Sequence, residues 1–259
     1  YVVRQIIRIF DILMEVSMPN LIEAENISKA WLEALNYLLN ECKKEYCTNL
    51  MVHIKNPLEL DEQIDRLYLR FCKENDLTNQ YKVATFIFPQ KLYHLYGDAR
   101  DKIYAKQKKI HKVVKGPWGS YFDQMVAWKG SKNDEPFNQV EKIIQLINSR
   151  ERTYKAAYTI QITNPKFHSN YVIGGPCLRY ITLQLNQKNK EMSFLALYRN
   201  HDFARRAYGN YIGLGNLLNF MANQTGFRVD TLTCVSSNAY IENKYKKRLR
   251  KLLVEATNE

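Results

Sequence analysis

The stretch GGPCLRY, residues 174–180, places a cysteine directly after Gly-Gly-Pro and directly before an apolar strand pattern, ITLQL. A cysteine in this setting can be a small core residue, a disulfide partner, a metal ligand or a nucleophile. The two glycines let a ligand approach the backbone closely. A nucleophilic cysteine acts as the thiolate, which a neighbouring positive charge stabilises. Cys177 is therefore the first candidate for chemistry.

A second set of candidates follows at residues 198–202, which read YRNHD, and Asn210 comes eight residues after Asp202. Arg199 can stabilise a thiolate and can also bind a phosphate group through two parallel hydrogen bonds. The Asn210 side chain offers a donor and an acceptor side by side, which matches the O4/N3 edge of a uracil-type ring. The alternatives are a surface ion pair between Arg199 and Asp202 and a helix N-cap at Asn210. We expect His201 to face away and assign it no role.

The elements that must position these residues alternate along the chain. We expect helices at residues 26–44, 61–74, 137–150, 211–227 and 242–256, and strands at residues 50–54, 156–165, 178–187, 192–203 and 231–241. Residues 82–109 are predicted to form an apolar turn or strand followed by a helix. Since no repeat, linker or composition break interrupts the chain, we predict one α+β domain over residues 1–259. Residues 1–20 would be an N-terminal extension, and residues 242–259 a basic C-terminal helix.

Composition narrows the classes of partner and compartment. The chain has 259 residues and a net charge of +12, which favours anionic partners such as nucleotides, nucleic acid or acidic membrane surfaces. The apolar first residues are interrupted by Arg4, Arg8, Asp11 and Glu15, so we expect no membrane span there. The five cysteines include no CxxC pair, which argues against a disulfide framework and a structural zinc site, and we propose no metal. A reducing, cytoplasmic setting fits best.

The order of the candidate residues resembles the thymidylate synthase family, nearest to its short archaeal-type members. Three motifs carry the resemblance: a Pro-Cys nucleophile, an Arg-Ser-x-Asp phosphate grip and a base-reading asparagine. They read here as Pro176-Cys177, Arg199-Asn200-His201-Asp202 and Asn210, with the Arg-to-Asp and Arg-to-Asn spacings kept. Upstream, GPWGSYFDQM and NSRERTYKAA look like the family's Gly-Pro-x-Tyr-Gly loop and Ser-Arg-Arg segment. Trp118 and Tyr121 in the loop can contact the base or the donor, with simple packing as the equal alternative.

The resemblance implies a single-domain fold with a mixed sheet packed against helices, and a homodimer through the sheet face. It implies that the Cys177 thiolate adds to C6 of a uracil nucleotide 5′-monophosphate. C5 then takes a methyl or hydroxymethyl group from a reduced folate or pterin, such as methylenetetrahydrofolate. In family members the arginine pair of the Ser-Arg-Arg segment reaches the partner's phosphate. The implied substrate-binding residues are Arg199, Asn200, Asp202, Asn210, Tyr240, Arg150 and Arg152.

The chain also departs from the family pattern. The strand that usually carries Asp-x-His-x-Tyr for the sugar hydroxyl reads SSNAYIEN, with Ser237, Ala239 and Ile241 at the ungapped matches. Tyr240 serves there only if the register slips by one, which leaves ribose and deoxyribose open. The family's catalytic glutamate has no placeable counterpart, and Gln90 is the nearest polar group. The usual apolar C-terminal tail is replaced by KYKKRLRKLLVEATNE.

Three hypotheses of function remain open. The first is a one-carbon transferase of the thymidylate synthase type. The second is a catalytically impaired nucleotide-binding protein on the same fold, serving as a sensor or scaffold. The third, a nucleic-acid-binding protein, depends only on charge. Its candidate residues, otherwise a solvated helix face, are Lys244, Lys246, Lys247, Arg248, Arg250 and Lys251.

Overall fold

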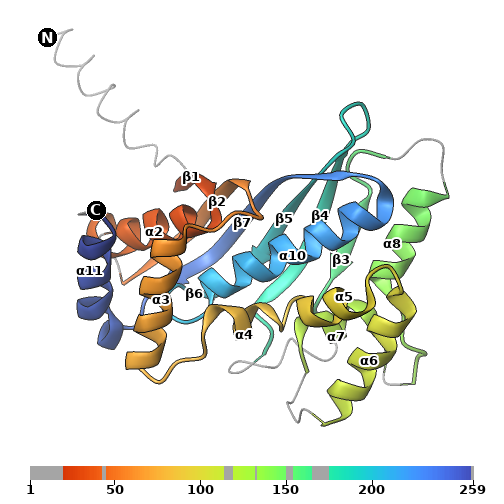
Figure 1. Ribbon diagram of the computed structural model, residues 1–259, viewed down its shortest axis with the longest axis horizontal. Coiled ribbons are helices and arrows are strands. Elements are labelled where there is room, and N and C mark those ends of the chain that lie inside the picture. Colours follow the sequence, from red (N-terminus) through yellow and green to blue (C-terminus); the bar gives the residue numbers. More distant parts are fainter. Residues whose placement is uncertain are drawn as a thin grey trace, which may run out of the picture.

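A single mixed β-sheet organises the structure. The computed structural model describes residues 20–42, 45–113, 119–131, 133–149, 154–164 and 175–257. Within these ranges seven strands form one sheet with the order β1-β2-β7-β5-β4-β3, and β6 lies beside β7 (Figure 1). The strands are β1 Leu21–Asn26, β2 Tyr46–Asn56, β3 Tyr158–Gln161, β4 Leu178–Asn186, β5 Glu191–Tyr198, β6 His201–Asp202 and β7 Arg228–Tyr240.

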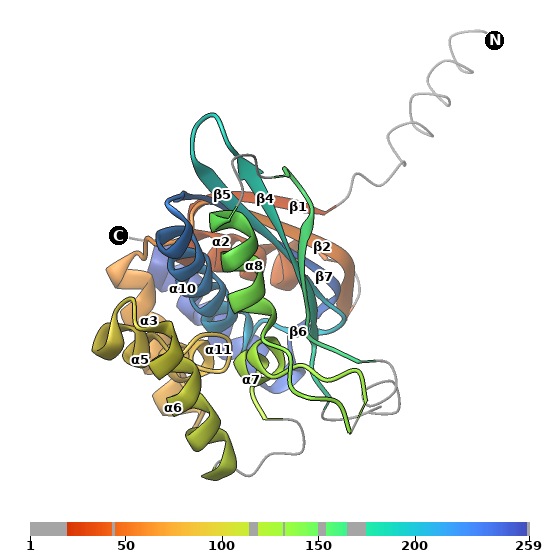
Figure 2. The same ribbon diagram turned by 90° about the vertical axis from the view of Figure 1, so that its right-hand side faces the viewer.

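The helices pack on one side of this sheet, as Figure 2 shows with the sheet seen nearly on edge. They are α2 Ile27–Asn36, α3 Glu62–Glu74, α4 Gln80–Ala84, α5 Gln90–Tyr96, α6 Arg100–Val113, α7 Tyr121–Val126, α8 Gln139–Asn148, α10 Ala207–Thr225 and α11 Asn243–Thr257. A π-helical turn, Tyr37–Glu41, continues α2. The predicted class, α+β with a mixed sheet packed against helices, is confirmed. In the described part of the chain, no helix is long and apolar enough to cross a bilayer.

The described helices cover one face of the sheet and leave the other face uncovered. Side chains of successive strand residues point to opposite faces, so register decides which residues share a face. Val52 pairs with Cys234 on the face that the helices bury. One position along, Met51, Val235 and Leu197 are neighbours across β2, β7 and β5 and are only partly buried. None of the described helices covers this second face (Figure 2).

The central helix α10 approaches its neighbours at backbone distance through glycines. A Cβ atom on Gly209 would lie 2.6 Å from the carbonyl oxygen of Gln80, and one on Gly213 would lie 2.8 Å from that of Ala84. Such contacts are too short for any larger residue, so glycine is what lets α10 pack on α4. The helix ends at Gly226, whose φ of 68° lies in the left-handed region that glycine favours. The helix predicted over residues 211–227 therefore ends at Thr225, just before this glycine.

Several element predictions were wrong in instructive ways. Residues 21–26 form the edge strand β1, although they follow directly on the predicted extension. Residues 82–84, within the predicted apolar turn or strand, belong to α4, because the Asn79 side chain accepts from the Lys82 amide and starts that helix; residues 85–87 then form the turn. The predicted strand over residues 192–203 is broken after Tyr198, and His201 begins the separate short strand β6.

Candidate active site around Cys177

The antiparallel pairing of β4 with β5 brings Cys177 and Arg199 together. Leu178 pairs with Tyr198, so the residues just beyond both strand ends become neighbours. The Arg199 amide donates to the Cys177 carbonyl oxygen at 2.9 Å. Its guanidinium donates to the carbonyl oxygens of Pro176 at 3.3 Å and Gly175 at 3.5 Å. Arg199 thus lies along the loop that carries Cys177, and its positive charge is close to the thiol.

Burial outweighs positive charge at the Cys177 thiol. Burial raises the pKa of this partly buried thiol above its ordinary value of 9.0, while Arg199, Arg179 and Arg206 each lower it. None of these arginines forms an ion pair with a carboxylate of the described residues. The geometry therefore collects three cations around one thiol and leaves them available for an anion. Arg199 lowers the pKa of the thiol, as expected, but within one chain burial raises that pKa by more.

Arg179 and Arg206 were missed from sequence. Arg179 stands two residues after Cys177 in β4, and residues two apart on a strand share a face. That spacing was the available signal. Arg206 stands at the N-cap of α10. Its place at the site depends on where this helix starts, and the sequence pattern put the start at residue 211 instead of Ala207.

Tyr121, from the GPWGSY loop, contacts the backbone at the cysteine. Its hydroxyl oxygen accepts from the backbone amides of Cys177 at 3.3 Å and Leu178 at 3.5 Å. Ser120 and Asp123 form a reciprocal capping box that fixes the start of α7 and with it the position of this tyrosine. Of the two alternatives for Tyr121, the described contacts are with the backbone of the cysteine loop. Trp118 lies outside the described residues.

Asp202 organises the turn that leads into α10. Its Oδ1 atom accepts from the amides of Ala204 at 3.0 Å and Arg205 at 3.1 Å, and its Oδ2 atom pairs with Arg205 Nε at 2.5 Å. Buried aromatic side chains hold the same turn from the other side. Trp31 Nε1 donates to the Phe203 carbonyl oxygen at 2.9 Å. The predicted grip residue therefore holds the backbone between Arg199 and Asn210; a direct contact with nucleotide stays a prediction.

His201 does not face away, and that expectation is wrong. Its side chain is buried, stacked on Tyr198 with ring centroids 4.1 Å apart and an angle of 3° between the rings. Its Nε2 atom lies 3.1 Å from Asn210 Nδ2, and its Nδ1 atom lies 2.9 Å from Ser236 Oγ. The short strand β6 turns the residue inward, because His201 pairs with Ala239 beside β7. The predicted base-reading asparagine is thus held by a residue that sequence reasoning left out.

Asn200 and Tyr240 each contact other residues of the chain, and their proposed contacts with substrate stay predictions. Asn200 Oδ1 accepts from Asn238 Nδ2 at 2.7 Å, so the SSNAYIEN strand contributes Asn238 to this end of the site. Tyr240 pairs in register with Asp202 and interacts with Arg205. Its hydroxyl pKa is raised by burial first and then by Asp202. A sugar contact from Tyr240 is untested and stays a prediction.

Two further expectations concern residues near the site. Arg150 and Arg152 lie outside the described residues. Gln90 begins α5, where its Nε2 atom lies 2.8 Å from His94 Nε2. It makes no contact with Cys177 among the hydrogen bonds of the described chain.

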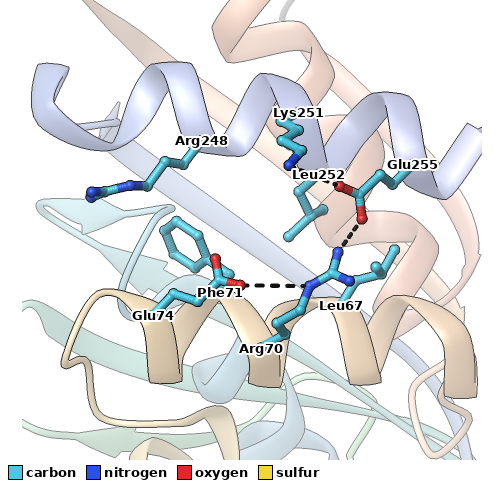
Figure 3. Close-up of a pocket in the computed structure, with 8 residues that line it drawn as sticks. All are labelled: Leu67, Arg70, Phe71, Glu74, Arg248, Lys251, Leu252 and Glu255. Atoms are coloured by element: carbon cyan, nitrogen blue, oxygen red, sulfur yellow. Dashed lines mark hydrogen bonds and ion pairs between the residues drawn. The ribbon is translucent and has the colours of Figure 1, made fainter.

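The basic C-terminal helix packs as a structural helix. Figure 3 shows a pocket of 330 Å³ between α3 and α11 in which Arg70 points toward Glu255 and Glu74. Lys251 also pairs with Glu255, at 3.9 Å, and Arg248 donates to Asn75. Acidic and amide groups thus contact several of the basic side chains of α11. Nucleic-acid binding by this helix stays a prediction.

Comparison with known proteins finds relatives over most of the chain. A curated protein of Methanosarcina mazei named "Putative thymidylate synthase" is 23% identical over 221 residues, which cover 85% of this chain and 88% of that protein. A protein with the same name from Methanococcoides burtonii is 22% identical over 249 residues, covering 92% of this chain and 97% of that protein. The findings fit a divergent member of the thymidylate synthase family. No protein-family model matches the chain.

The predicted resemblance to thymidylate synthases is therefore confirmed, including its archaeal leaning. In this structure Cys177, Arg199 and Asn210 belong to one connected set, joined through the β4–β5 pairing and the stacked pair Tyr198 and His201.

Proposed function

We propose that this chain binds a uracil nucleotide 5′-monophosphate and that the Cys177 thiolate adds to C6 of the base, as a transferase of the thymidylate synthase type. Under this proposal C5 then receives a methyl or hydroxymethyl group. The observation that carries the proposal is the guanidinium of Arg199 lying along the Gly175–Cys177 loop, beside the thiol. Phosphate binding and thiol addition need those two groups side by side.

Each residue has a distinct part in the proposed reaction. Arg199 would bind the phosphate, with the Asp202-braced turn fixing its distance from Asn210. Asn210 would hold the uracil edge. Binding energy gained far from the ring would then position C6 over the sulfur, which converts the addition into a step within one complex. The Tyr121 hydroxyl would hold the backbone at the cysteine during that step.

The proposed one-carbon donor, a reduced folate or pterin, finds no fitting site among the described residues. The helix α11 stands where thymidylate synthases carry an apolar tail that closes over the site. Here its buried residues Tyr245, Leu249 and Leu252 belong to the main core, and Tyr245 packs edge-on against Phe71 of α3. A helix packed in this way is not free to close over Cys177.

A homodimer through the uncovered sheet face belongs to the same proposal. Met51, Val235 and Leu197 give this face an apolar strip that no described helix covers. His53 and Thr233 add a hydrogen-bonded polar pair on the same face, 2.9 Å apart. Association there would bury apolar area that the monomer leaves partly exposed. Arg150 and Arg152 are the proposed contributors to the partner's phosphate site.

Bromide release tests the proposed addition without any donor. The protein is incubated with 5-bromo-UMP and 5-bromo-dUMP in the presence of dithiothreitol. Cys177 adds at C6 and C5 takes a proton; dithiothreitol then removes the bromine as bromide while it is oxidised to its disulfide, and the cysteine leaves. Bromide release by wild type and not by Cys177→Ser would support the nucleophile and identify the sugar. Tight nucleotide binding by calorimetry without bromide release would contradict the enzyme.

The second candidate, a nucleotide-binding sensor or scaffold, is favoured by two observations. Burial keeps the thiol pKa above its ordinary value despite three arginines. The C-terminal helix is packed into the core instead of being available as a lid. Both features weaken transfer chemistry and leave unchanged the residues proposed to bind the phosphate and the base. Calorimetric binding of UMP or dUMP, unchanged in Cys177→Ser and without bromide release, is the result that this candidate predicts.

A further inference from the structure

The contact between His201 and Asn210 bears on which pyrimidine the site accepts. A side-chain amide presents an oxygen acceptor and a nitrogen donor on one edge, and rotating it by half a turn exchanges them. Uracil offers an N3–H donor and an O4 acceptor. Cytosine offers an N3 acceptor and an amino donor at the same places. The orientation of the Asn210 amide therefore decides which of the two bases it complements.

Asn210 has one orientation in the structure, with its amide nitrogen toward His201. Its Nδ2 atom lies 3.1 Å from His201 Nε2, inside the buried core. An amide nitrogen can only donate, so Nε2 must be the unprotonated nitrogen of a neutral ring. The other nitrogen, Nδ1, then carries the hydrogen and donates to Ser236 Oγ at 2.9 Å. Burial lowers the pKa of His201 to about 3, so the ring stays neutral at physiological pH.

Asn210 keeps the groups that a base needs. Nδ2 carries two hydrogens, so it can donate one to His201 and the other to a ligand. Oδ1 accepts no hydrogen bond from any described residue. We propose that His201, in its Nδ1–H tautomer, is a positioning residue that holds the Asn210 amide with Oδ1 and one Nδ2 hydrogen directed at N3–H and O4, and so selects uracil over cytosine. This inference rests on the proposed nucleotide site.

The rings around His201 fix which ring nitrogen faces Asn210. Tyr198 stacks on one face of the imidazole, while Phe203 and Tyr211 meet it edge-on at centroid distances of 5.1 and 5.8 Å. Such packing leaves the ring no room to rotate and exchange its nitrogens. The half-turn of Asn210 would set its Oδ1 lone pairs against those of Nε2. The reverse reading would require the hydrogen to move to Nε2.

Two measurements on the intact protein test the inference. The first is ¹⁵N NMR of histidine-labelled, nucleotide-free protein, which reports which ring nitrogen of His201 carries the hydrogen; His201→Phe assigns the signal. The second is calorimetry with UMP, CMP, dUMP and dCMP. We expect Nδ1–H and a preference of about 10- to 100-fold for the uracil nucleotide over its cytosine counterpart, the usual discrimination of a two-point base contact.

Two variants separate positioning from folding. His201→Phe keeps the aromatic stack and removes the acceptor, so Asn210 can turn over. The uracil preference should fall to about threefold or less through tighter cytosine binding, which a merely misfolded site would not give. Tyr211→Phe removes a hydroxyl without a partner among the described residues from the same cluster. It should keep the preference.

The outcomes distinguish this inference from the proposed function. A hydrogen on Nε2, or an unchanged preference in a folded His201→Phe protein, would overturn the role of His201 while nucleotide binding and bromide release stand. Failure of all four nucleotides to bind would overturn both. Nδ1–H, a uracil preference and its loss in His201→Phe alone would establish the selection.

Discussion

The buried histidine makes the stability of this protein depend on acid in a way that one variant isolates. His201 is 1% exposed, and burial lowers its pKa from 6.5 to about 3. The unfolded chain therefore binds a proton at this residue between about pH 6.5 and pH 3, while the folded chain does not. Stability from this group is fully present above pH 6.5 and is lost as the pH falls through that window.

The size of the effect follows from the pKa difference. Each pKa unit corresponds to about 1.4 kcal/mol, so at pH 4, two and a half units below the unfolded pKa, His201 costs the folded state about 3 kcal/mol. His201→Phe removes this term. The variant also leaves Asn210 and Ser236 without their ring partner, which costs about 1–3 kcal/mol at every pH. The wild type should have the larger free energy of unfolding at pH 7, and this advantage should be gone by pH 4.

The measurement is urea unfolding of both proteins at pH 7, 5.5 and 4, followed by circular dichroism at one fixed protein concentration. The quantity of interest is the difference between the two unfolding free energies, because acid effects on shared carboxylates cancel in it. Tyr211→Phe, in the same cluster, is the matched control and should track the wild type. A difference that stays constant from pH 7 to pH 4 would refute the reasoning, since it would mean that His201 titrates alike in both states.

Three further outcomes are expected. Gly215→Ala should lower the unfolding free energy by about 1–3 kcal/mol in urea titration, because its Cβ would lie 2.2 Å from a backbone oxygen of the neighbouring loop. Arg100→Ala should cost about 1–2 kcal/mol in the same assay, because its guanidinium binds both oxygens of Glu141, at 2.8 and 3.0 Å. Alkylation of Cys177 by iodoacetamide should still rise with pH above 9, and Arg179→Gln should move that profile upward. An unchanged profile would count against Arg179 as a source of thiol acidity.

Residue spacing predicted the parts of the site that follow from strand pairing. Cys177 and Arg199 flank two consecutive strands, and an antiparallel pair joined by a short turn must bring such positions together. Asn210 was placed at the start of a helix, and it does lie in the first turns of α10. Placing these residues requires only the order of strands and helices, and hydrophobic periodicity predicts that order.

The inward turn of His201 could not be predicted in the same way. Alternation along residues 192–203 predicts one continuous strand, which gives every second residue the same face. The break after Tyr198 resets that alternation. A local turn forms there, in which Asp202 accepts from the amides that follow it, and a tertiary contact holds it, in which Trp31 donates to the Phe203 carbonyl oxygen. No local pattern encodes a contact with a residue so far away in the sequence. The helical α4 region was missed for a simpler reason, since a short apolar run is compatible with either a strand or a helix.

The balance of forces at Cys177 indicates what must complete the site before the thiol reacts. Burial exceeds the pull of three arginines, and a bound phosphate would take up the charge of Arg199, leaving still less for the thiolate. Additional cations would lower the thiol pKa, and in the proposed homodimer Arg150 and Arg152 of a second copy are the candidates. Bromide release per chain should then rise with protein concentration and level off once dimers form, as followed by sedimentation. A rate per chain that is constant across the monomer–dimer transition would mean that one chain activates its own thiol, and the role proposed for the second copy would be wrong.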